Sequence, residues 1–420
     1  MNVRRRSSAA ALAAIAVIGA ATAPAVAADP SPSASPSTTT PSGLYGTADP
    51  QYDGVWRQSL ALLAQDTAGV VPSSKAVKWL TDQQCANGSF APFRADPAKA
   101  CDAKTMVDTN STAAAVQALW AVGGHGDVVE DALGWLKSVQ NKDGGWGYSP
   151  GTPSDANSTS VVVGALTATE TNPEDVEKGG KSPYDALLTF ALPCAKDKGA
   201  GAFAFQPDKD GKLLPNADAT AAGVLGALGR GLVTEAGSGA KSKAATCSDA
   251  DGPTREQAAA NGTAYLADAL AKDGHLVSTL GGSADQPDYG NTADAVVALA
   301  AQGGADKAAE SLAWLKKNAA EWAAESGPAA YAQLILAAHA TGTDPRDFGG
   351  TDLVEKLNAT GPAPQGTAAK DTAATSDKAA DEEDKKDDSP FGVWWFVGVC
   401  LVFGIGIGFL LSNRSKKQQP

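Results

Sequence analysis

The chain has 420 residues and a formal net charge of −13, with 47 acidic side chains against 34 basic ones. This acidic balance argues against binding to nucleic acid, whose phosphate backbone requires a basic surface. The five cysteines show no CxxC spacing, so the sequence gives little support to a zinc site or a dithiol redox site.

Residues 1–28 have the pattern of a cleaved export signal. Arginines at positions 4–6 precede an apolar run over 9–21, and small residues follow up to Ala28. A basic start, a short apolar run and an Ala-x-Ala site are typical of a secretory signal peptide. We expect export by the general secretory route, with the twin-arginine route as the alternative.

Residues 29–48 are rich in Ser, Thr and Pro and are expected to form an extended linker.

Residues 49–360 then carry internal repeats. The pattern aromatic-Leu-x3-Gln-x3-Gly-x-aromatic occurs at Trp79–Phe90 and again at Trp135–Trp146, and degenerate copies begin at Tyr265, Trp314 and, more weakly, Phe190. Repeats of about 50 residues predict one helical hairpin per unit, each needing its neighbours to bury its apolar face.

A second pattern follows each repeat loop. A short stretch of Asp, Asn, Ser and Thr precedes an Ala-rich apolar run at 108–112, 155–159, 216–220 and 288–292. These residue types directly before an apolar run predict a helix N-cap. Each unit is therefore expected to hold an amphipathic outer helix, a glycine-aromatic loop and an Ala-rich inner helix. Further helices are expected at 55–65 and 353–357.

The C-terminal part predicts a membrane anchor. Residues 361–390 lack hydrophobic periodicity and read as a disordered acidic stalk. Residues 391–411 carry no charge, which is long enough for a helix to cross a hydrocarbon core of about 30 Å. Arg414, Lys416 and Lys417 follow, and the positive-inside rule puts the tail 412–420 in the cytoplasm. We expect a single-pass protein of the cell membrane with its domain outside the cytoplasm.

Cysteine usage agrees with export. Cys400 lies in the expected membrane span, and the remaining four cysteines allow three pairings. Proximity in sequence favours Cys85–Cys101 and Cys194–Cys247.

The repeat signature resembles that of the prenyltransferase and squalene-cyclase superfamily, closely in two repeats and loosely over 49–360. That resemblance implies an all-α domain, an α/α toroid in which inner helices are ringed by outer ones. Among its non-enzymatic members, the chain looks most like the helical domain of the corrinoid carriers intrinsic factor and transcobalamin. In place of their second, β-rich domain, it carries a stalk and a membrane span.

The catalytic groups of the superfamily's enzymes are not evident. Its terpene cyclases use an Asp-x-Asp-Asp-Thr-Ala acid, but amides replace key carboxylates in the four cap motifs, and an amide is not a strong proton donor. The zinc site of protein prenyltransferases and the thioester segment of complement-like members are also missing. These observations favour a non-enzymatic protein with no catalytic residue, no metal and no catalytic cofactor.

The expected binding site is one end of the ring, where the loop aromatics and inner-helix N-termini meet. Aromatic faces and amides together suit an amphipathic ligand. The candidate ligand-binding residues are Phe90, Asp108, Asn110, Trp146, Tyr148, Asp155, Asn157, Phe205, Asp218, Tyr289 and Asn291. We also expect Phe203 at this rim. Helix capping alone is the competing interpretation for the Asp residues.

The sequence thus predicts capture of a corrinoid or similar small molecule at the membrane surface. A membrane transporter or a second clamping protein would be the partner. The alternatives are a surface enzyme of the terpene cyclase and prenyltransferase superfamily, or a structural surface protein, because one fold hosts several functions.

Overall fold

The computed structural model describes residues 41–194, 199–235, 247–248, 254–278 and 286–367. The expected export signal and the apolar segment 391–411 lie outside these residues. Within the described ranges, no helix is both long enough and apolar enough to cross a membrane.

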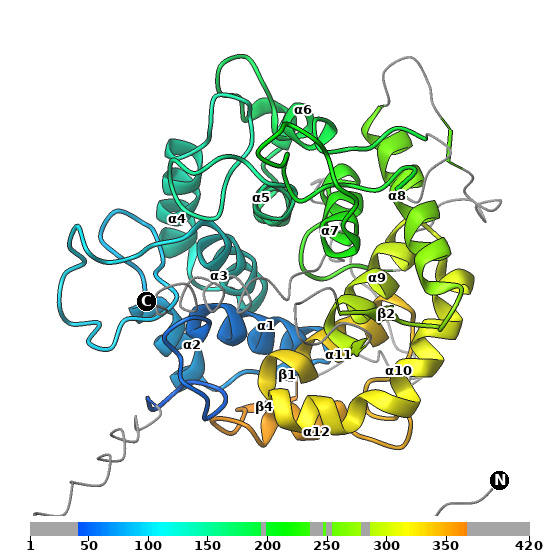
Figure 1. The fold of residues 1–420 in the computed structure, drawn as a ribbon. Helices are drawn as coiled ribbons and strands as arrows, with labels where there is room; N and C mark the ends of the chain where they lie inside the picture. The colour runs from blue at the N-terminus through cyan, green and yellow to red at the C-terminus, as the bar shows by residue number, and fades with distance from the viewer. Residues whose placement is uncertain (1–40, 195–198, 236–246, 249–253, 279–285, 368–420) are drawn as a thin grey trace, which may run out of the picture. The chain divides into compact units, whose positions relative to one another are not determined.

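The described residues form two concentric layers of helices (Figure 1). The inner helices are α1 (Gly54–Thr67), α3 (Thr109–Val122), α5 (Ala156–Ala168), α7 (Ala217–Ala227), α9 (Tyr289–Ala301) and α11 (Pro328–Ala340). The outer helices are α2 (Ser74–Asp82), α4 (Gly126–Ser138), α6 (Pro183–Leu188), α8 (Arg255–Leu270), α10 (Ala305–Ser326) and α12 (Leu353–Asn358). A 3-10 helix, η1, spans Pro173–Asp175.

Contacts between successive inner helices close the ring. Each of them packs on the next, from α1 through α3, α5, α7 and α9 to α11, and α11 returns to α1. The α/α toroid is therefore confirmed. The helices expected beside the repeats, at 55–65 and 353–357, are α1 and α12, and they belong to the ring.

Small residues let the inner helices approach one another closely. A Cβ added to Gly226 of α7 would lie 2.4 Å from the Ser160 hydroxyl on α5, and one added to Gly164 would lie 2.3 Å from Gly231 Cα. Residues 156–166 of α5 are all buried. Larger side chains at Gly164 and Gly226 would push these neighbouring segments apart.

In four repeats, a threonine hydroxyl group joins the loop to the inner helix. The Trp146 backbone N–H donates to Thr159 Oγ1 at 3.1 Å, and the Phe90 N–H donates to Thr112 Oγ1 at 3.0 Å. Phe203 and Leu276 make the same bond to Thr220 and Thr292. The repeated threonine is thus a connector between the loop and the helix.

In the two clearest repeats, a glutamine in the loop joins the repeat to the next one. Gln140 Nε2 donates to the Gly144 carbonyl at 2.8 Å within its own loop and to the Val176 carbonyl at 2.9 Å in the next unit. Gln84 bonds Gly88 and Val128 in the same way. The Gln and Gly of the signature therefore build the ring.

Both ends of the ring domain extend past the expected boundaries. Tyr45, placed in the linker from sequence, is fully buried, and its hydroxyl donates to Gln65 Oε1 at 3.1 Å. After α12, β4 (Gly366–Thr367) pairs antiparallel with β1 (Val70–Val71). A second two-stranded sheet joins β2 (Leu276–Val277) to β3 (Pro287–Asp288).

The two expected disulfides are confirmed. Cys85 is bonded to Cys101 and Cys194 to Cys247, with Cα–Cα distances of 5.6 and 5.5 Å.

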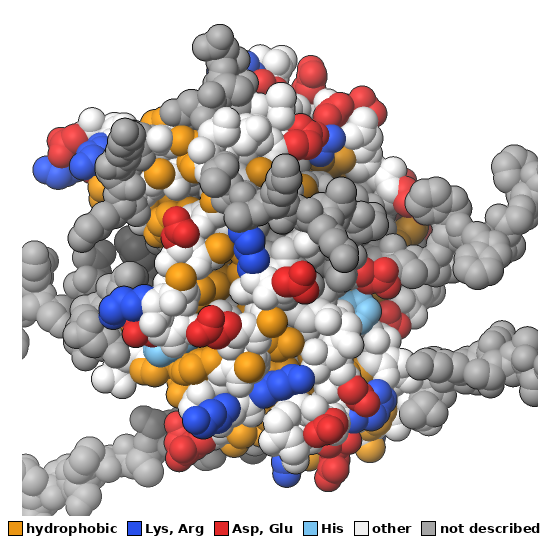
Figure 2. All heavy atoms as spheres, turned by 90° about the vertical axis from the view of Figure 1, so that its right-hand side faces the viewer, with side chains coloured by type: hydrophobic (Ala, Val, Ile, Leu, Met, Phe, Trp, Pro, Cys, Tyr) orange, Lys and Arg blue, Asp and Glu red, His pale blue; other side chains and the backbone are white. Residues whose placement is uncertain are grey.

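On the outer surface around α8 and α10, acidic and basic side chains are mixed with small apolar patches (Figure 2).

Candidate functional site

The N-termini of four inner helices meet at one end of the ring, and each is capped by a side chain. Asp108 and Asp155 accept from the N–H groups of Ser111 and Ser158 at 2.6 and 2.7 Å. Asn216 caps α7, and Asp288 caps α9. Helix capping, the competing interpretation from sequence, therefore describes what these four side chains do locally. We call this end of the ring the mouth.

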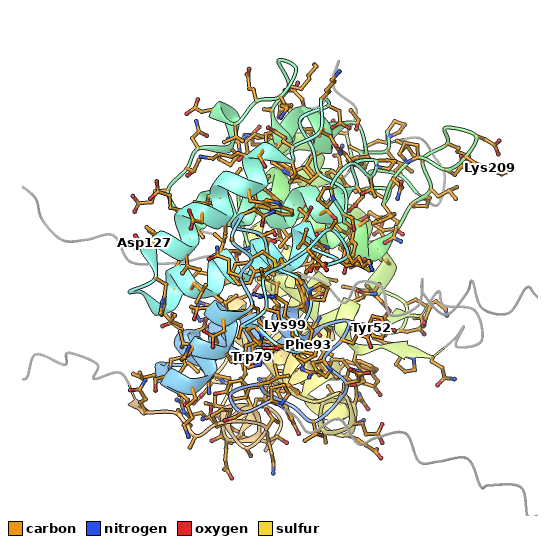
Figure 3. The ribbon with its side chains drawn as sticks, turned by 90° about the vertical axis from the view of Figure 1, so that its left-hand side faces the viewer. Tyr52, Trp79, Phe93, Lys99, Asp127 and Lys209 are labelled. Carbon is orange, nitrogen blue, oxygen red and sulfur yellow. A yellow bond between two sulfur atoms is a disulfide. The ribbon has the colours of Figure 1, made fainter. Side chains whose placement is uncertain are left out.

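The two ends of the ring are distinct. Asp127, which begins the outer helix α4, and Lys209, in the loop before the inner helix α7, lie at opposite edges of the domain (Figure 3). Outer helices run antiparallel to inner ones, so the mouth is the Lys209 end.

A hydrogen bond across the mouth links two inner helices. Asn157 on α5 donates from Nδ2 to Asp218 Oδ2 on α7 at 2.7 Å. Asn157 is 1% exposed. Asp218 keeps some exposed surface, but its Oδ1 is shielded from solvent. The sequence placed both residues in the candidate site but did not predict that they pair.

Several buried oxygen atoms around this pair have no hydrogen-bond partner. They are Asp108 Oδ2, Asn110 Oδ1, Asn157 Oδ1, Asp218 Oδ1 and Asn291 Oδ1. Buried polar atoms in native proteins are nearly always hydrogen-bonded, so an exception calls for an explanation such as a bound ligand or water. The concentration of such atoms at the mouth marks it as the candidate site. We call the seven residues Asp108, Asn110, Asp155, Asn157, Asp218, Asp288 and Asn291 the mouth cluster.

Burial favours the protonated form of the carboxyl groups in this cluster. The pKa of Asp218 is raised to about 7, mainly by desolvation and also by the nearby charges of Asp288 and Asp155, against the lowering effect of the bond from Asn157. Burial also raises the pKa of Asp108 and Asp155 to about 6. Asp218 therefore holds its proton to a higher pH than an exposed carboxyl group does, and can act as a proton donor near neutral pH.

The predicted aromatic residues separate into three groups. Phe90, Trp146 and Phe203 are fully buried, so they pack in the core and differ from the expected rim. Phe205 is half-buried, as is Tyr289, which stacks between Trp314 and Trp322 with ring centroids 5.0 and 5.4 Å away.

Tyr148 is an exposed aromatic residue at the mouth, with 41% of its surface accessible. The N–H of Thr109, next to Asp108, donates to the Tyr148 carbonyl at 2.9 Å. Burial raises the pKa of the Tyr148 phenol, and the charge of Asp108 raises it further.

Two hollows lie in the described part of the protein, and neither is lined by a residue of the mouth cluster. One, of about 330 Å³, lies near Tyr184 and Arg255, and another, of about 450 Å³, lies beside the Cys85–Cys101 disulfide. No group of His, Cys, Asp and Glu among the described residues has an arrangement that would hold a metal ion.

Residues 55–197 match the prenyltransferase alpha-alpha toroid domain. This match covers the two clearest repeats and agrees with the observed ring. Drimenyl diphosphate synthase from Streptomyces showdoensis is 34% identical over 110 residues, which are 24% of this chain and 19% of the synthase. The chain thus matches about a fifth of that relative.

Solved structures with a similar fold include two enzymes. One is ent-copalyl diphosphate synthase from Streptomyces platensis, at 14% identity and a TM-score of 0.46, covering 69% of this chain and half of the synthase. The other is the type II terpene cyclase MstE from Scytonema, at 14% identity and a TM-score of 0.42, covering 65% of this chain and 72% of the cyclase.

The expected corrinoid-capturing carrier is wrong. A relative with a curated function, matched over 19% of its length, is a synthase, and this similarity favours the enzyme that was the alternative from sequence. The small number of carboxylates in the cap motifs led us to favour a non-enzymatic protein over an enzyme, and this preference was wrong. The pKa of Asp218 depends on its burial and on carboxylates from two other helices, and the motif alone does not report either.

Proposed function

We propose that this protein is an enzyme that protonates a carbon–carbon double bond of an isoprenoid substrate, with Asp218 as the general acid. The observation that carries the proposal is the Asp218 carboxyl group, whose pKa is raised to about 7 and whose Oδ1 has no partner. A carboxylic acid kept neutral near pH 7 by its surroundings is suited to general-acid catalysis.

The local sequence supports this role. Asn216–Ala221 reads Asn-Ala-Asp-Ala-Thr-Ala. Compared with the acid motif Asp-x-Asp-Asp-Thr-Ala, it retains the second carboxylate, the threonine and the final alanine. Asp218 is the retained carboxylate, and Thr220 fastens α7 to the Phe203 loop. The two missing carboxylates are replaced by Asn216, which caps the helix, and by Ala219.

The reaction needs no co-reactant. Asp218 transfers its proton to one alkene carbon, the π electrons form the new C–H bond, and the other carbon becomes cationic. A second double bond of the same molecule attacks that cation and closes a ring. Loss of a proton from a carbon atom to solvent then ends the reaction, and the Asp218 carboxylate takes up one proton from solvent. The product is therefore an isomer of the substrate.

Incubation in D2O tests this proposal. The purified full-length protein is mixed with linear isoprenoid alcohols and diphosphates, and the products are examined by mass spectrometry. The expected product carries one solvent deuterium on carbon. Asp218→Asn is expected to lower the rate by about 10²–10⁴, whereas Asp127→Asn, at the other end of the ring, leaves it unchanged. Absence of any deuterated isomer from the panel contradicts the proposal.

We also propose that the chain is exported and anchored by residues 391–411, as the sequence indicates. Two disulfides in the described domain support this location, because disulfides persist mainly in oxidising compartments. Protease added to intact cells should release the domain by cutting within 368–390. A domain that stays protected until the cells are lysed contradicts this topology.

A further inference from the structure

The mouth cluster presents hydrogen-bond acceptors that have no donors. The five buried oxygen atoms without a partner come from Asp108, Asn110, Asn157, Asp218 and Asn291. Two of the residues, Asn110 and Asn157, are 4% and 1% exposed. Acceptors so shielded from water are costly unless a ligand supplies donors.

The same cluster carries negative charge without a matching cation. Asp155 and Asp288 are the charged groups that act on Asp218, and both are carboxylates. In the described part of the chain, no ion pair includes Asp108, Asp155, Asp218 or Asp288. The partial positive charges at four inner-helix N-termini repel a cation at this site. Each is equivalent to only about half an elementary charge, and each N-terminus carries a polar cap.

An aromatic ring borders this charge. Tyr148 is exposed at the mouth, and its carbonyl accepts from the N–H of Thr109, the residue after Asp108, at 2.9 Å. The face of a tyrosine ring attracts organic cations.

We infer that the mouth cluster binds an organic ammonium ion, whose N–H groups donate to the unpartnered oxygens while its charge faces Asp218 and its neighbouring carboxylates. This inference rests on the same site as the proposed function. The ammonium ion would take the place of the cation that forms when Asp218 gives up its proton. Binding itself requires no reaction.

Three matched probes separate charge from hydrogen bonding. Benzylammonium has both the charge and N–H donors, benzyltrimethylammonium has the charge alone, and benzyl alcohol is neutral. Each is titrated by calorimetry into the full-length protein in lipid nanodiscs at pH 8, where Asp218 is largely ionised. Benzylammonium is expected to bind at least roughly tenfold more tightly than benzyl alcohol, with benzyltrimethylammonium between them. Equal affinities, or no binding of benzylammonium, overturn the inference.

Variants then locate the site. Asp218→Asn is expected to weaken benzylammonium binding at least about tenfold, and Asn157→Ala, which keeps the charge, by a smaller factor. Asp127→Asn, an acidic residue at the opposite end of the ring, serves as the control. If it weakens binding as much as Asp218→Asn, the site is elsewhere and the inference fails. Circular dichroism of each variant checks that it is folded.

Binding and turnover can fail separately. Deuterated product without benzylammonium binding overturns this inference and leaves the proposed reaction standing. Benzylammonium binding without turnover of any isoprenoid has the opposite consequence.

Discussion

The hydroxyl group of Thr159 joins the Trp146 loop to the inner helix α5. Its Oγ1 accepts from the Trp146 N–H inside the protein, where Thr159 is fully buried. Thr159→Val keeps the shape of the side chain but leaves that N–H without a partner, which typically costs about 1–3 kcal/mol. We expect chemical denaturation to show a loss in this range.

Thr159→Ser is the matched control, because serine keeps the hydroxyl group and loses one methyl group, worth roughly 0.8 kcal/mol. If the serine variant is as unstable as the valine variant, packing of the methyl group rather than the hydrogen bond holds the loop.

The raised pKa of Asp218 makes stability depend on pH in a definite direction. The ordinary pKa of the side chain is 3.8, and in the folded protein it is about 7. Between these values the folded protein holds a proton that the unfolded chain has released, so stability falls as pH rises from about 4 to 7. Asp108 and Asp155 act in the same direction up to about pH 6.

Thermal melting at pH 5 and pH 8 measures this dependence. The melting temperature should be higher at pH 5, and the difference should shrink in Asp218→Asn, which has no proton to release. An unchanged difference in this variant would mean that Asp218 is ionised in the folded protein, and general-acid catalysis by it would then be untenable.

At the scale of helices and loops, the repeat signature predicted most of what is observed. Asp, Asn and Thr before each Ala-rich run specified the caps, and the Gln-x3-Gly spacing specified the loops, because these depend on bonds within one or two units. The arrangement of side chains at the mouth could not be predicted from the sequence in the same way. The Asn157–Asp218 bond joins residues 61 positions apart, and which loop aromatics are exposed depends on packing between units. Trp146 is buried while Tyr148, two residues later, is exposed.

The glycine of the signature provides a test at this scale. Gly144 has φ +88°, and an added Cβ would lie 2.2 Å from the Ser182 carbonyl of the next unit. Gly144→Ala should therefore destabilise the protein by more than the roughly 1–2 kcal/mol of the left-handed backbone alone. Gly134, in the exposed part of α4, has no atom near its added Cβ, and Gly134→Ala should be neutral or stabilising by up to about 1 kcal/mol. Equal effects of the two changes on the melting temperature would contradict the contact between units.

Closure of the ring is a property of the whole domain and joins residues from its two ends. Gly46 N–H donates to the Thr360 carbonyl at 2.8 Å, and Gln65 Nε2 donates to Asn358 Oδ1 at 2.6 Å. The helix α12 packs on α11 and α1, with Leu353, Val354 and Leu357 buried. An open array of repeats would leave the apolar faces of its first and last units uncovered, so the seam between α1 and α12 should be needed for stability.

Two fragments with intact disulfides test this seam. Residues 41–367 contain every described contact across it, and residues 41–351 lack α12 and β4. We expect the longer fragment to melt in one cooperative transition, because all units are covered. The shorter one should melt at a lower temperature and over a broader range, since α1 and α11 lose their shared cover. Hydrogen exchange should then rise first in α1 and α11 and last in α5 and α7, on the far side of the ring. If the shorter fragment melts like the longer one, or if exchange rises evenly around the ring, closure does not contribute to stability and each hairpin is held by its immediate neighbours alone.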